Sequence, residues 1–557
     1  MTELLIANMA PIMFGALVVF LLSGFPVAFS LAANGLFFGL VGIELGLLKP
    51  ELLQALPNRL FGIMANDTLL AIPFFTFMGL ILERSGMAED LLDTIGQLFG
   101  PLRGGVAYAV VFVGALLAAT TGVVAASVIS MGLISLPVML RYGYDKRVAT
   151  GIIAASGTLA QIIPPSLVLI VMADQLGRSV GDMYQAAFIP GLMLTVMYAA
   201  YVFGCSIFKP QWVPALPLEA RNSLHEPNGD SGLRSLLFLF VGTVSAAFLI
   251  AELYKVYHPS LASDEIWIFS TSIGVIGAFV VAFLNRKLKL GLLSRMAERI
   301  VFVLIPPLAL IFLVLGTIFI GVATPTEGGG MGAVGALILA LMNRRLSWDL
   351  LKQAMNSTAR LSSFVMFILI GSSVFSLVFR AVNGDLWVEH LLTSLPGGTA
   401  GFLIVVNILF FFLAFFLDFF ELAFILIPLV GPVADKLGID LIWFGVLISI
   451  NMQTSFMHPP FGFALFYLRS VAPKEVKTSD IYWGAIPFVI IQVIMVALIL
   501  TFPQIISIAH KTDMKEKLEL RLDMPRPGYG TSDSIPSFSN DSGDGGMQLN
   551  FSTDSDK

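Results

Sequence analysis

The sequence predicts an all-α, polytopic membrane protein built from two related halves, and three observations predict it. The 557-residue chain is 57% hydrophobic, and only 12% of its residues are charged, about half the charged share of a soluble domain. Its mean hydropathy is +0.88. Several apolar runs reach the roughly 20 residues that a membrane-spanning helix needs. Finally, two sets of landmarks recur along the chain at one spacing.

The apolar runs predict the membrane spans in chain order. Because lipid cannot satisfy free backbone N–H and C=O groups, we expect these runs to be helices rather than barrel strands. The longest are residues 10–40, 105–140, 148–173, 186–208, 235–254, 300–322, 361–379, 401–434 and 481–509.

An internal repeat relates the two halves of the chain. The stretch LPVMLRYGYD ends at Asp145 and GPVADKLGID ends at Asp440. The proline pairs of QIIPPS and FMHPPF begin at Pro164 and Pro459. Both pairs of landmarks lie 295 positions apart, without a gap between them. Self-similarity at a fixed offset indicates that the chain is a duplicated half.

The repeat sets the expected domain boundaries. Residues 1–208 form the first transmembrane repeat and residues 300–508 the second. Residues 209–299 contain a polar linker and two extra candidate transmembrane helices without a counterpart in either half. Residues 509–557 are rich in Ser, Asp, Gly and Pro, and we expect them to form a disordered cytoplasmic tail, because this composition buries too little apolar surface.

Basic residues near the spans predict the orientation of the halves. Residues 285–299 and 343–360 are the most basic loops, and two candidate spans separate them, so both are expected on the cytoplasmic side. The corresponding loop of the first half, residues 44–59, carries only Lys49 and Arg59. We therefore expect the first half to be inverted relative to the second.

Several function classes lack the residues they need. No G-x-x-x-x-G-K-[ST] stretch occurs, so the chain does not hydrolyse ATP through a P-loop, and any transport must draw on a gradient or another chain. The single cysteine, Cys205, excludes an internal disulfide. A membrane enzyme needs a nucleophile with a base or a metal cluster, but none of the five histidines has ligand spacing, so no enzyme activity and no cofactor are expected.

The polar stretch GVATPTEGGGMGAVGAL at 321–337 interrupts an apolar region. Thr324 is placed as an N-cap, Pro325 as the first helical residue and Glu327 as the partner in a capping box. The glycines that follow give the helix a face on which another backbone can pack. A structural helix cap is the first interpretation, and direct substrate contact by Glu327 is the alternative.

Two spans are expected to be broken at proline pairs, at 156–173 and 451–468. Each proline removes a backbone donor, and lipid cannot satisfy the freed carbonyls, so paired breaks indicate a polar site at the membrane midplane. Oxygen-rich residues beside the breaks are suited to Na+; a packed kink is the alternative. The candidate binding residues are Ser156, Gly157, Thr158, Pro164 and Pro165 in the first break, and Asn451, Gln453, Thr454, Ser455, Pro459 and Pro460 in the second.

A candidate re-entrant hairpin precedes each break, at about 118–140 and about 415–434. Thr121, Gly122 and Ser127 mark the first as candidate binding residues. Asp418 and Glu421 mark the second, lie three apart on one helical face, and are costly in lipid. Contact with headgroups or an ion pair, for example with Arg380, is the alternative for these carboxylates. His458 is interpreted as a packing residue, with proton transfer as the alternative.

The motifs resemble a known family, the large membrane subunit of the tripartite ATP-independent periplasmic (TRAP) transporters. The resemblance rests on GVATPTEGGGMGAVGAL, RYGYDKRVATGIIAASGTLAQIIPPS, FFLDFFELAFILIPLVGPVADKLGID and NMQTSFMHPPFGFALFYLRSVAP, and it covers nearly all of both halves. It implies a multi-pass protein of the bacterial inner membrane with inverted repeats, which imports small organic anions, mostly carboxylates, by an elevator mechanism.

The resemblance also implies a coupling ion, partners and site positions. Sodium would drive transport, bound near Thr121, Ser156, Asn451 and Thr454. A periplasmic substrate-binding protein would deliver the solute, and a small membrane subunit would pair with this chain; no nucleic acid is implied. The chain departs from the family pattern at Val123, so that sodium coordination there would rely on backbone carbonyls. It also departs at Glu421 and His458, which leaves open proton involvement or a different solute. Its two extra helices lie beyond the core pattern and would replace or brace the small subunit. A passive channel or anchoring subunit is the remaining rival.

Overall fold

The computed structural model describes residues 6–217, 219–220, 232–257, 263–460 and 462–506, and within them it is helical without strands. Eight helices in these ranges are long and apolar enough to cross a membrane, or up to ten if each bent helix pair is one span. The chain is thus an all-α, polytopic membrane protein, as predicted. The predicted tail lies outside the described residues, as does part of the polar linker.

The described part of the first half is a succession of α-helices with short 3-10 turns. The α-helices are α2 (Met9–Leu22), α3 (Val27–Glu44), α4 (Leu56–Met64), α5 (Asp67–Arg84), α6 (Met87–Phe99), α7 (Gly105–Thr121), α8 (Val124–Arg141), α9 (Lys146–Thr158), α10 (Leu167–Leu176) and α11 (Val180–Phe208), and the 3-10 turns are η1 (Pro50–Ala55), η2 (Leu159–Gln161) and η3 (Pro210–Trp212).

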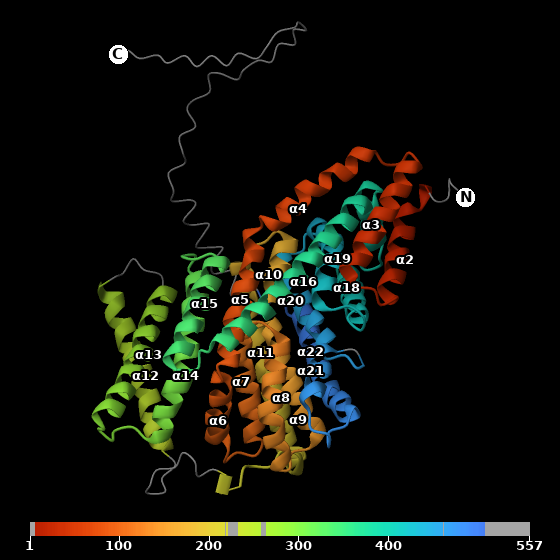
Figure 1. The fold of residues 1–557 in the computed structure, drawn as a ribbon. Helices are drawn as coiled ribbons and strands as arrows, with labels where there is room; N and C mark the ends of the chain where they lie inside the picture. The colour runs from red at the N-terminus through yellow and green to blue at the C-terminus, as the bar shows by residue number, and fades with distance from the viewer. Residues whose placement is uncertain (1–5, 218, 221–231, 258–262, 461, 507–557) are drawn as a thin grey trace, which may run out of the picture. The chain divides into compact units, whose positions relative to one another are not determined.

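Two helices join the halves, α12 (Leu233–Tyr257) and α13 (Ser263–Leu288), which pack on each other and on α14 (Figure 1). The second half contains α14 (Arg295–Phe319), α15 (Pro325–Met342), α16 (Trp348–Ala381), α17 (Gly384–Thr393), α18 (Gly398–Leu413), α19 (Phe419–Lys436), α20 (Leu441–Gln453), α21 (Phe463–Val471) and α22 (Thr478–Thr501), with a 3-10 turn at η5 (Thr454–Phe456).

Two expectations about spans and loops are wrong. The apolar run 10–40 is not one span but two helices, α2 and α3, because the chain turns at residues 23–26, where Gly24 has a left-handed φ of 80°. Residues 348–360, predicted as part of a basic loop, form the first part of the 34-residue helix α16. Ser347 caps this helix by accepting a hydrogen bond from the Leu350 N–H, which starts it well before its apolar part.

Helices of the first half pack against helices of the second half. Helix α3 packs on α16 and α5 packs on α15, so each pair joins one helix from each half. Further along, α8 packs on α21 and α10 packs on α19. Small residues permit these contacts: a Cβ at Gly35 of α3 would lie 2.9 Å from the backbone of Phe375 on α16. Each half therefore buries part of its helix surface against the other half.

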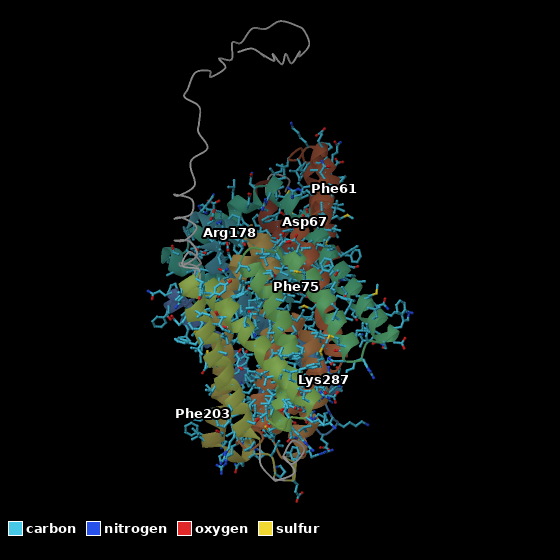
Figure 2. All side chains as sticks on the ribbon, turned by 90° about the vertical axis from the view of Figure 1, so that its left-hand side faces the viewer. Phe61, Asp67, Phe75, Arg178, Phe203 and Lys287 are labelled. Carbon is cyan, nitrogen blue, oxygen red and sulfur yellow. The ribbon has the colours of Figure 1, made fainter. Side chains whose placement is uncertain are left out.

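The surface is as apolar as expected for a protein in lipid. Phe61 of α4 is 73% exposed and Phe203 of α11 is 59% exposed, and Figure 2 shows both rings at the periphery. Phe75 of α5 is 1% exposed and lies inside the helix bundle (Figure 2). Many large apolar side chains are exposed along the helices that can span a membrane, which indicates that these faces contact the acyl chains.

Candidate functional site

The first diproline lies in an interruption between two helices. Helix α9 ends at Thr158 and continues as the 3-10 turn η2, and α10 starts only at Leu167. The turn of the preceding helix pair, α7 and α8, reaches this gap. At that turn Gly122 has a left-handed φ of 57°, and a Cβ there would lie 3.2 Å from the carbonyl oxygen of Pro165. The turn and the break are thus in direct contact.

The candidate residues of the first half gather around this contact. Thr121 is the last residue of α7, and Ser127 is fully buried in α8. Gly157 lets α9 approach α8, because a Cβ there would overlap the side chain of Val128. Thr158 donates a hydrogen bond from Oγ1 to the Ala155 carbonyl at 2.8 Å. The antiparallel pair spans 105–141, so it begins earlier than the predicted 118–140.

The second diproline lies in an equivalent interruption. Helix α20 ends at Gln453, η5 continues to Phe456, and α21 starts at Phe463. Thr454 donates from Oγ1 to the Asn451 carbonyl at 2.7 Å. The ring of His458 stacks on Phe415 with the ring centroids 4.1 Å apart, and it meets the edge of Phe411 at 4.4 Å. His458 therefore packs against the end of α18 and the turn after it.

Asp418 and Glu421 form a capping box at the start of α19. Asp418 Oδ1 accepts a hydrogen bond from the Glu421 N–H at 2.8 Å, and Glu421 Oε2 accepts one from the Asp418 N–H at 2.9 Å. Asp418 is thus the N-cap, not a residue on the helical face that we expected it to share with Glu421. Among the ion pairs of the described ranges, none joins either carboxylate to Arg380.

The two breaks meet at a hydrogen bond between equivalent residues. Gln453 Nε2 donates to Thr158 Oγ1 at 3.1 Å, and these two residues are 295 positions apart, which is the offset of the repeat. Each is therefore the counterpart of the other in the sequence repeat. A second buried contact between the halves joins α22 to α11, where Gln492 Nε2 donates to Tyr198 Oη at 2.9 Å.

Four buried side-chain oxygens near the breaks have no hydrogen-bond partner within the described ranges. They are Ser156 Oγ, Gln161 Oε1, Gln453 Oε1 and Ser455 Oγ, and each residue is at most 2% exposed. An unsatisfied buried oxygen costs free energy, so such groups ordinarily bind water or an ion. Hydroxyl and amide oxygens, without a carboxylate among them, are suitable ligands for a hard monovalent cation.

Sequence reasoning missed three polar residues of this region. Asn407 of α18 accepts two hydrogen bonds from Asn451 Nδ2, at its backbone oxygen at 2.8 Å and at Oδ1 at 2.9 Å. Gln161 lies within the first break, and Gln492 lies on α22. Each is a single amide within an apolar run. This signal was available, because an amide inside a transmembrane helix needs a partner.

The stretch at 321–337 has the geometry expected of a helix cap. The Glu327 N–H donates to Thr324 Oγ1 at 3.3 Å, the Thr324 N–H donates to Glu327 Oε2 at 2.8 Å, and Pro325 is the first residue of α15. Its glycine face meets α5, because a Cβ at Gly329 would lie 3.0 Å from the Cβ of Phe74. Glu327 therefore has a complete structural explanation.

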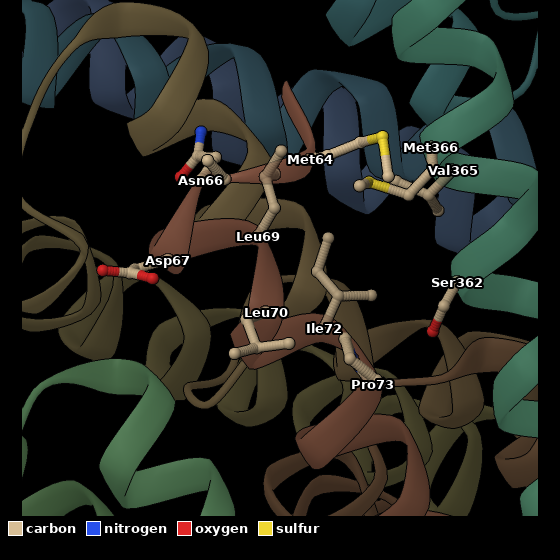
Figure 3. A pocket seen from close by; sticks show the side chains of 11 residues that line it. Met64, Asn66, Asp67, Leu69, Leu70, Ile72, Pro73, Ser362, Val365 and Met366 are labelled. Carbon is tan, nitrogen blue, oxygen red and sulfur yellow. The ribbon is translucent and has the colours of Figure 1, made fainter. Parts of the chain in front are cut away.

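Two cavities border α16. The first, of about 270 Å³, lies between the start of α5 and the middle of α16, where Asn66, Asp67 and Ser362 line it with apolar neighbours (Figure 3). Beside it Asn66 Nδ2 donates to Asp174 Oδ1 of α10 at 2.6 Å. The second, of about 590 Å³, lies between the start of α3 and α16, and Glu421 lines it.

Known proteins resemble this chain over most of its length. The sequence model of the family described as "Tripartite ATP-independent periplasmic transporter, DctM component" matches residues 14–505. The C4-dicarboxylate TRAP transporter large permease protein DctM of Pseudomonas aeruginosa is 28% identical over 460 residues, 82% of this chain and 90% of that protein. The sialic acid TRAP transporter permease protein SiaT of Haemophilus influenzae is 24% identical over 486 residues, 87% of this chain and 65% of that protein.

A solved structure is also similar. The YdaH transporter of Alcanivorax borkumensis aligns with a TM-score of 0.47 and 15% sequence identity, covering 82% of this chain and 89% of that chain. The family assignment rests on the sequence match, which spans both halves and both breaks. The chain therefore belongs to the DctM components of the tripartite ATP-independent periplasmic transporters, and it is a multi-pass protein of the inner membrane.

Proposed function

We propose that this chain is the permease of a sodium-driven, binding-protein-dependent importer of small organic carboxylates. One observation carries the proposal: two interrupted helices from equivalent halves meet through Gln453 and Thr158, with unsatisfied buried oxygens beside them. A passive channel or an anchoring subunit does not need such duplicated breaks. Paired interruptions of this kind form substrate and ion sites in secondary transporters.

The proposed ion site uses the oxygens around the breaks. In the first half these are the hydroxyls of Ser156 and Thr158 and the backbone at Gly122, which abuts Pro165. In the second half they are Thr454, Ser455 and the Asn451 amide, whose position Asn407 fixes. Na+ favours hydroxyl, amide and carbonyl oxygens, and no protein carboxylate is required at these positions.

We also propose which helices move. The helices α7–α11 and α18–α22 contain the turns and the breaks. Helices of the first group pack on helices of the second, and we assign both groups to the moving unit. The helices α2–α5 pack on α14–α16 in the same way, and these two groups together would stay fixed. Sliding of the first set past the second would carry the site across the membrane, which is the elevator mechanism.

Reconstitution tests this function. The chain would be placed in proteoliposomes with its small membrane subunit, and its periplasmic binding protein loaded with a labelled organic acid would be added outside. We expect accumulation only with an inward sodium gradient, and collapse of that gradient with a sodium ionophore should abolish it. Uptake that continues unchanged without the gradient would reject sodium coupling and favour the channel.

A further inference from the structure

The end of α13 and the turn that follows it combine cations with exposed leucines. Residues 286–292, which we call the basic turn, contain the exposed cations Arg286, Lys287 and Lys289. The candidate membrane span of α13 ends at Leu288, so these cations lie where the helix leaves the apolar part of the bilayer. Three leucines of the same segment are also exposed: Leu288 is 60%, Leu290 52% and Leu292 70% exposed.

The basic turn is folded back on the end of α13. Asn285, which is 4% exposed, accepts the Leu292 N–H at Oδ1 at 2.8 Å and donates from Nδ2 to Glu298 Oε1 of α14 at 2.6 Å. Lys289 has a left-handed φ of 51°, a backbone conformation that lysine rarely adopts. The turn therefore presents its cations from a defined conformation.

The cations of the basic turn have no acidic partner among the ion pairs of the described ranges. Arg286 Cζ lies 5.2 Å from the ring centroid of Phe302 on α14, and Lys287 Nζ lies 5.9 Å from that of Phe283. These ring contacts orient the two side chains without neutralising them. The turn therefore carries three positive charges that attract an anion.

A second helix brings a further cation to the same end. The Ser294 N–H donates to Ser235 Oγ at 3.0 Å, and Ser294 Oγ donates to the Gly232 carbonyl at 3.0 Å, so the start of α12 is joined to the start of α14. Arg234 of α12 is exposed there, and the ion pairs of the described ranges do not include it. These cations thus gather on α12–α14, at the face that the basic loops predict to be cytoplasmic.

We infer that the basic turn binds the headgroup of an anionic phospholipid and thereby anchors α13 and α14 in one leaflet. Charge complementarity identifies the occupant: the three cations attract a negative headgroup, and the exposed leucines beside them fit the acyl chains of the same molecule. A free anion such as phosphate would leave these leucines without an apolar contact. The lipid site stands independently of the proposed transport. With α14 in the set that stays fixed, the lipid would hold that set in the leaflet while the other set moves.

Competition between two lipids tests this inference on the purified, full-length chain. Dioleoylphosphatidylglycerol and dioleoylphosphatidylcholine have the same acyl chains and differ in the charge of the headgroup. Native mass spectrometry of the chain, incubated in detergent with an equimolar mixture, would count the bound molecules of each lipid. We expect at least about tenfold more bound phosphatidylglycerol than phosphatidylcholine, and equal numbers of the two would overturn the inference. An excess of inorganic phosphate during the incubation should leave this preference in place, and its loss would overturn the assignment to a lipid.

Two glycine substitutions assign the preference to the basic turn. Lys289→Gly removes a cation and suits the left-handed backbone, so the chain should stay folded while its preference for phosphatidylglycerol falls by about threefold or more. Arg344→Gly is the matched control, because Arg344 is also exposed and has a left-handed φ of 55°. It lies after α15, where the neighbouring Arg345 is paired with Asp90 at 2.8 Å, so it is not part of a cluster of unpaired cations. Arg344→Gly should leave the preference unchanged.

A combined variant removes all three cations of the basic turn. Arg286→Gln, Lys287→Gln and Lys289→Gly together should abolish the preference for phosphatidylglycerol. A combined variant that keeps the preference would place the lipid elsewhere and overturn the inference. The Tm of each variant in detergent reports whether the fold is kept. If the combined variant unfolds, the glycine pair still decides, because an equal preference in Lys289→Gly and Arg344→Gly would also overturn the inference.

Discussion

Asp418 combines a helix cap with a half-buried carboxyl group, and one substitution separates the cap from the charge. Asparagine caps helices as well as aspartate does, so Asp418→Asn keeps the hydrogen bond from the Glu421 N–H and removes only the negative charge. If the charge serves transport, sodium-dependent uptake should fall by about tenfold or more, a loss of at least about 1.4 kcal/mol in transition-state terms. Initial uptake rates in proteoliposomes measure this.

Asp440 provides the matched control for that substitution. It caps α20 by accepting from the N–H groups of Ile442 and Trp443, and it lies at the far end of α20 from the break. Asp440→Asn should leave uptake near that of the wild type. Equal rates for Asp418→Asn and Asp440→Asn would mean that Asp418 is a cap and nothing more.

Thr324 should matter for stability and not for transport. Replacement by alanine removes the acceptor for the Glu327 N–H, and the loss of an N-cap costs about 1 kcal/mol. Glu327→Gln should be nearly neutral, because glutamine completes a capping box as well. The Tm in detergent, together with sodium-dependent uptake, checks both variants. A large uptake defect in Glu327→Gln at unchanged Tm would instead support substrate contact by Glu327.

Single residues were predictable where the local chain determines their role. The capping box at Thr324 follows from T-P-T-E alone, since all its partners lie within four residues. The same D-x-x-E pattern at Asp418 also forms a capping box, although the pair is interpreted from the sequence as functional carboxylates or as carboxylates in contact with headgroups or in an ion pair. The bond between Asn407 and Asn451 links residues 44 positions apart, so no local pattern contains it.

Helices α9 and α22 meet where two glycines face each other. A Cβ at Gly151 would overlap the carbonyl oxygen of Gly484, and a Cβ at Gly484 would overlap that of Arg147. Backbone on both sides leaves no flexible side chain to yield. Gly151→Ala should therefore destabilise the chain by about 1–3 kcal/mol, as overpacking does, and lower its Tm in detergent.

A glycine without neighbours shows whether that loss comes from contact. Gly204 lies within α11, and no atom lies within 4 Å of the position that an added Cβ would occupy. Gly204→Ala should therefore be neutral or stabilise the helix by up to about 1 kcal/mol. If both alanine variants lower the Tm equally, the close approach of α9 and α22 is not what makes Gly151 necessary.

The apolar pattern located helices well but placed several ends wrongly. Hydropathy identifies the segments that face lipid. It does not locate the turn at residues 23–26, because this turn divides an apolar run with only a few polar residues. Conversely, residues 348–360 are polar enough to resemble a loop, yet they are part of helix α16. Helix continuity depends on backbone hydrogen bonds and caps, which hydropathy does not report.

The sequence predicts a duplication, but it does not predict which helices of the two halves pack together. The offset of 295 positions that joins Pro164 to Pro459 reappears in the hydrogen bond between Thr158 and Gln453. Yet the exchange of partners, α3 with α16 and α5 with α15, depends on contacts between segments that are hundreds of residues apart. The similarity of two segments indicates that they share a fold. It does not indicate whether a helix packs within its own half or on the other half.

Cross-linking distinguishes relative motion of the two helix sets from a rigid protein. Asn66 and Asp174 are joined by a hydrogen bond of 2.6 Å, and in the proposed mechanism they belong to the fixed and the moving set respectively. The lone native cysteine, Cys205, is buried and would be replaced by alanine. Joining Asn66→Cys to Asp174→Cys with a short bis-maleimide should then abolish sodium-dependent uptake, because the moving set can no longer slide.

The control pair lies entirely within the moving set. Arg178, which follows α10, forms an ion pair of 3.5 Å with Asp435 near the end of α19. The same reagent on Arg178→Cys and Asp435→Cys should leave uptake largely intact, since both residues would travel together. The comparison holds the chemistry and the cross-link length constant and changes only which helix sets are joined. Continued uptake with Asn66→Cys joined to Asp174→Cys would reject the elevator assignment, and loss of uptake in both pairs would show that the set boundary is drawn in the wrong place.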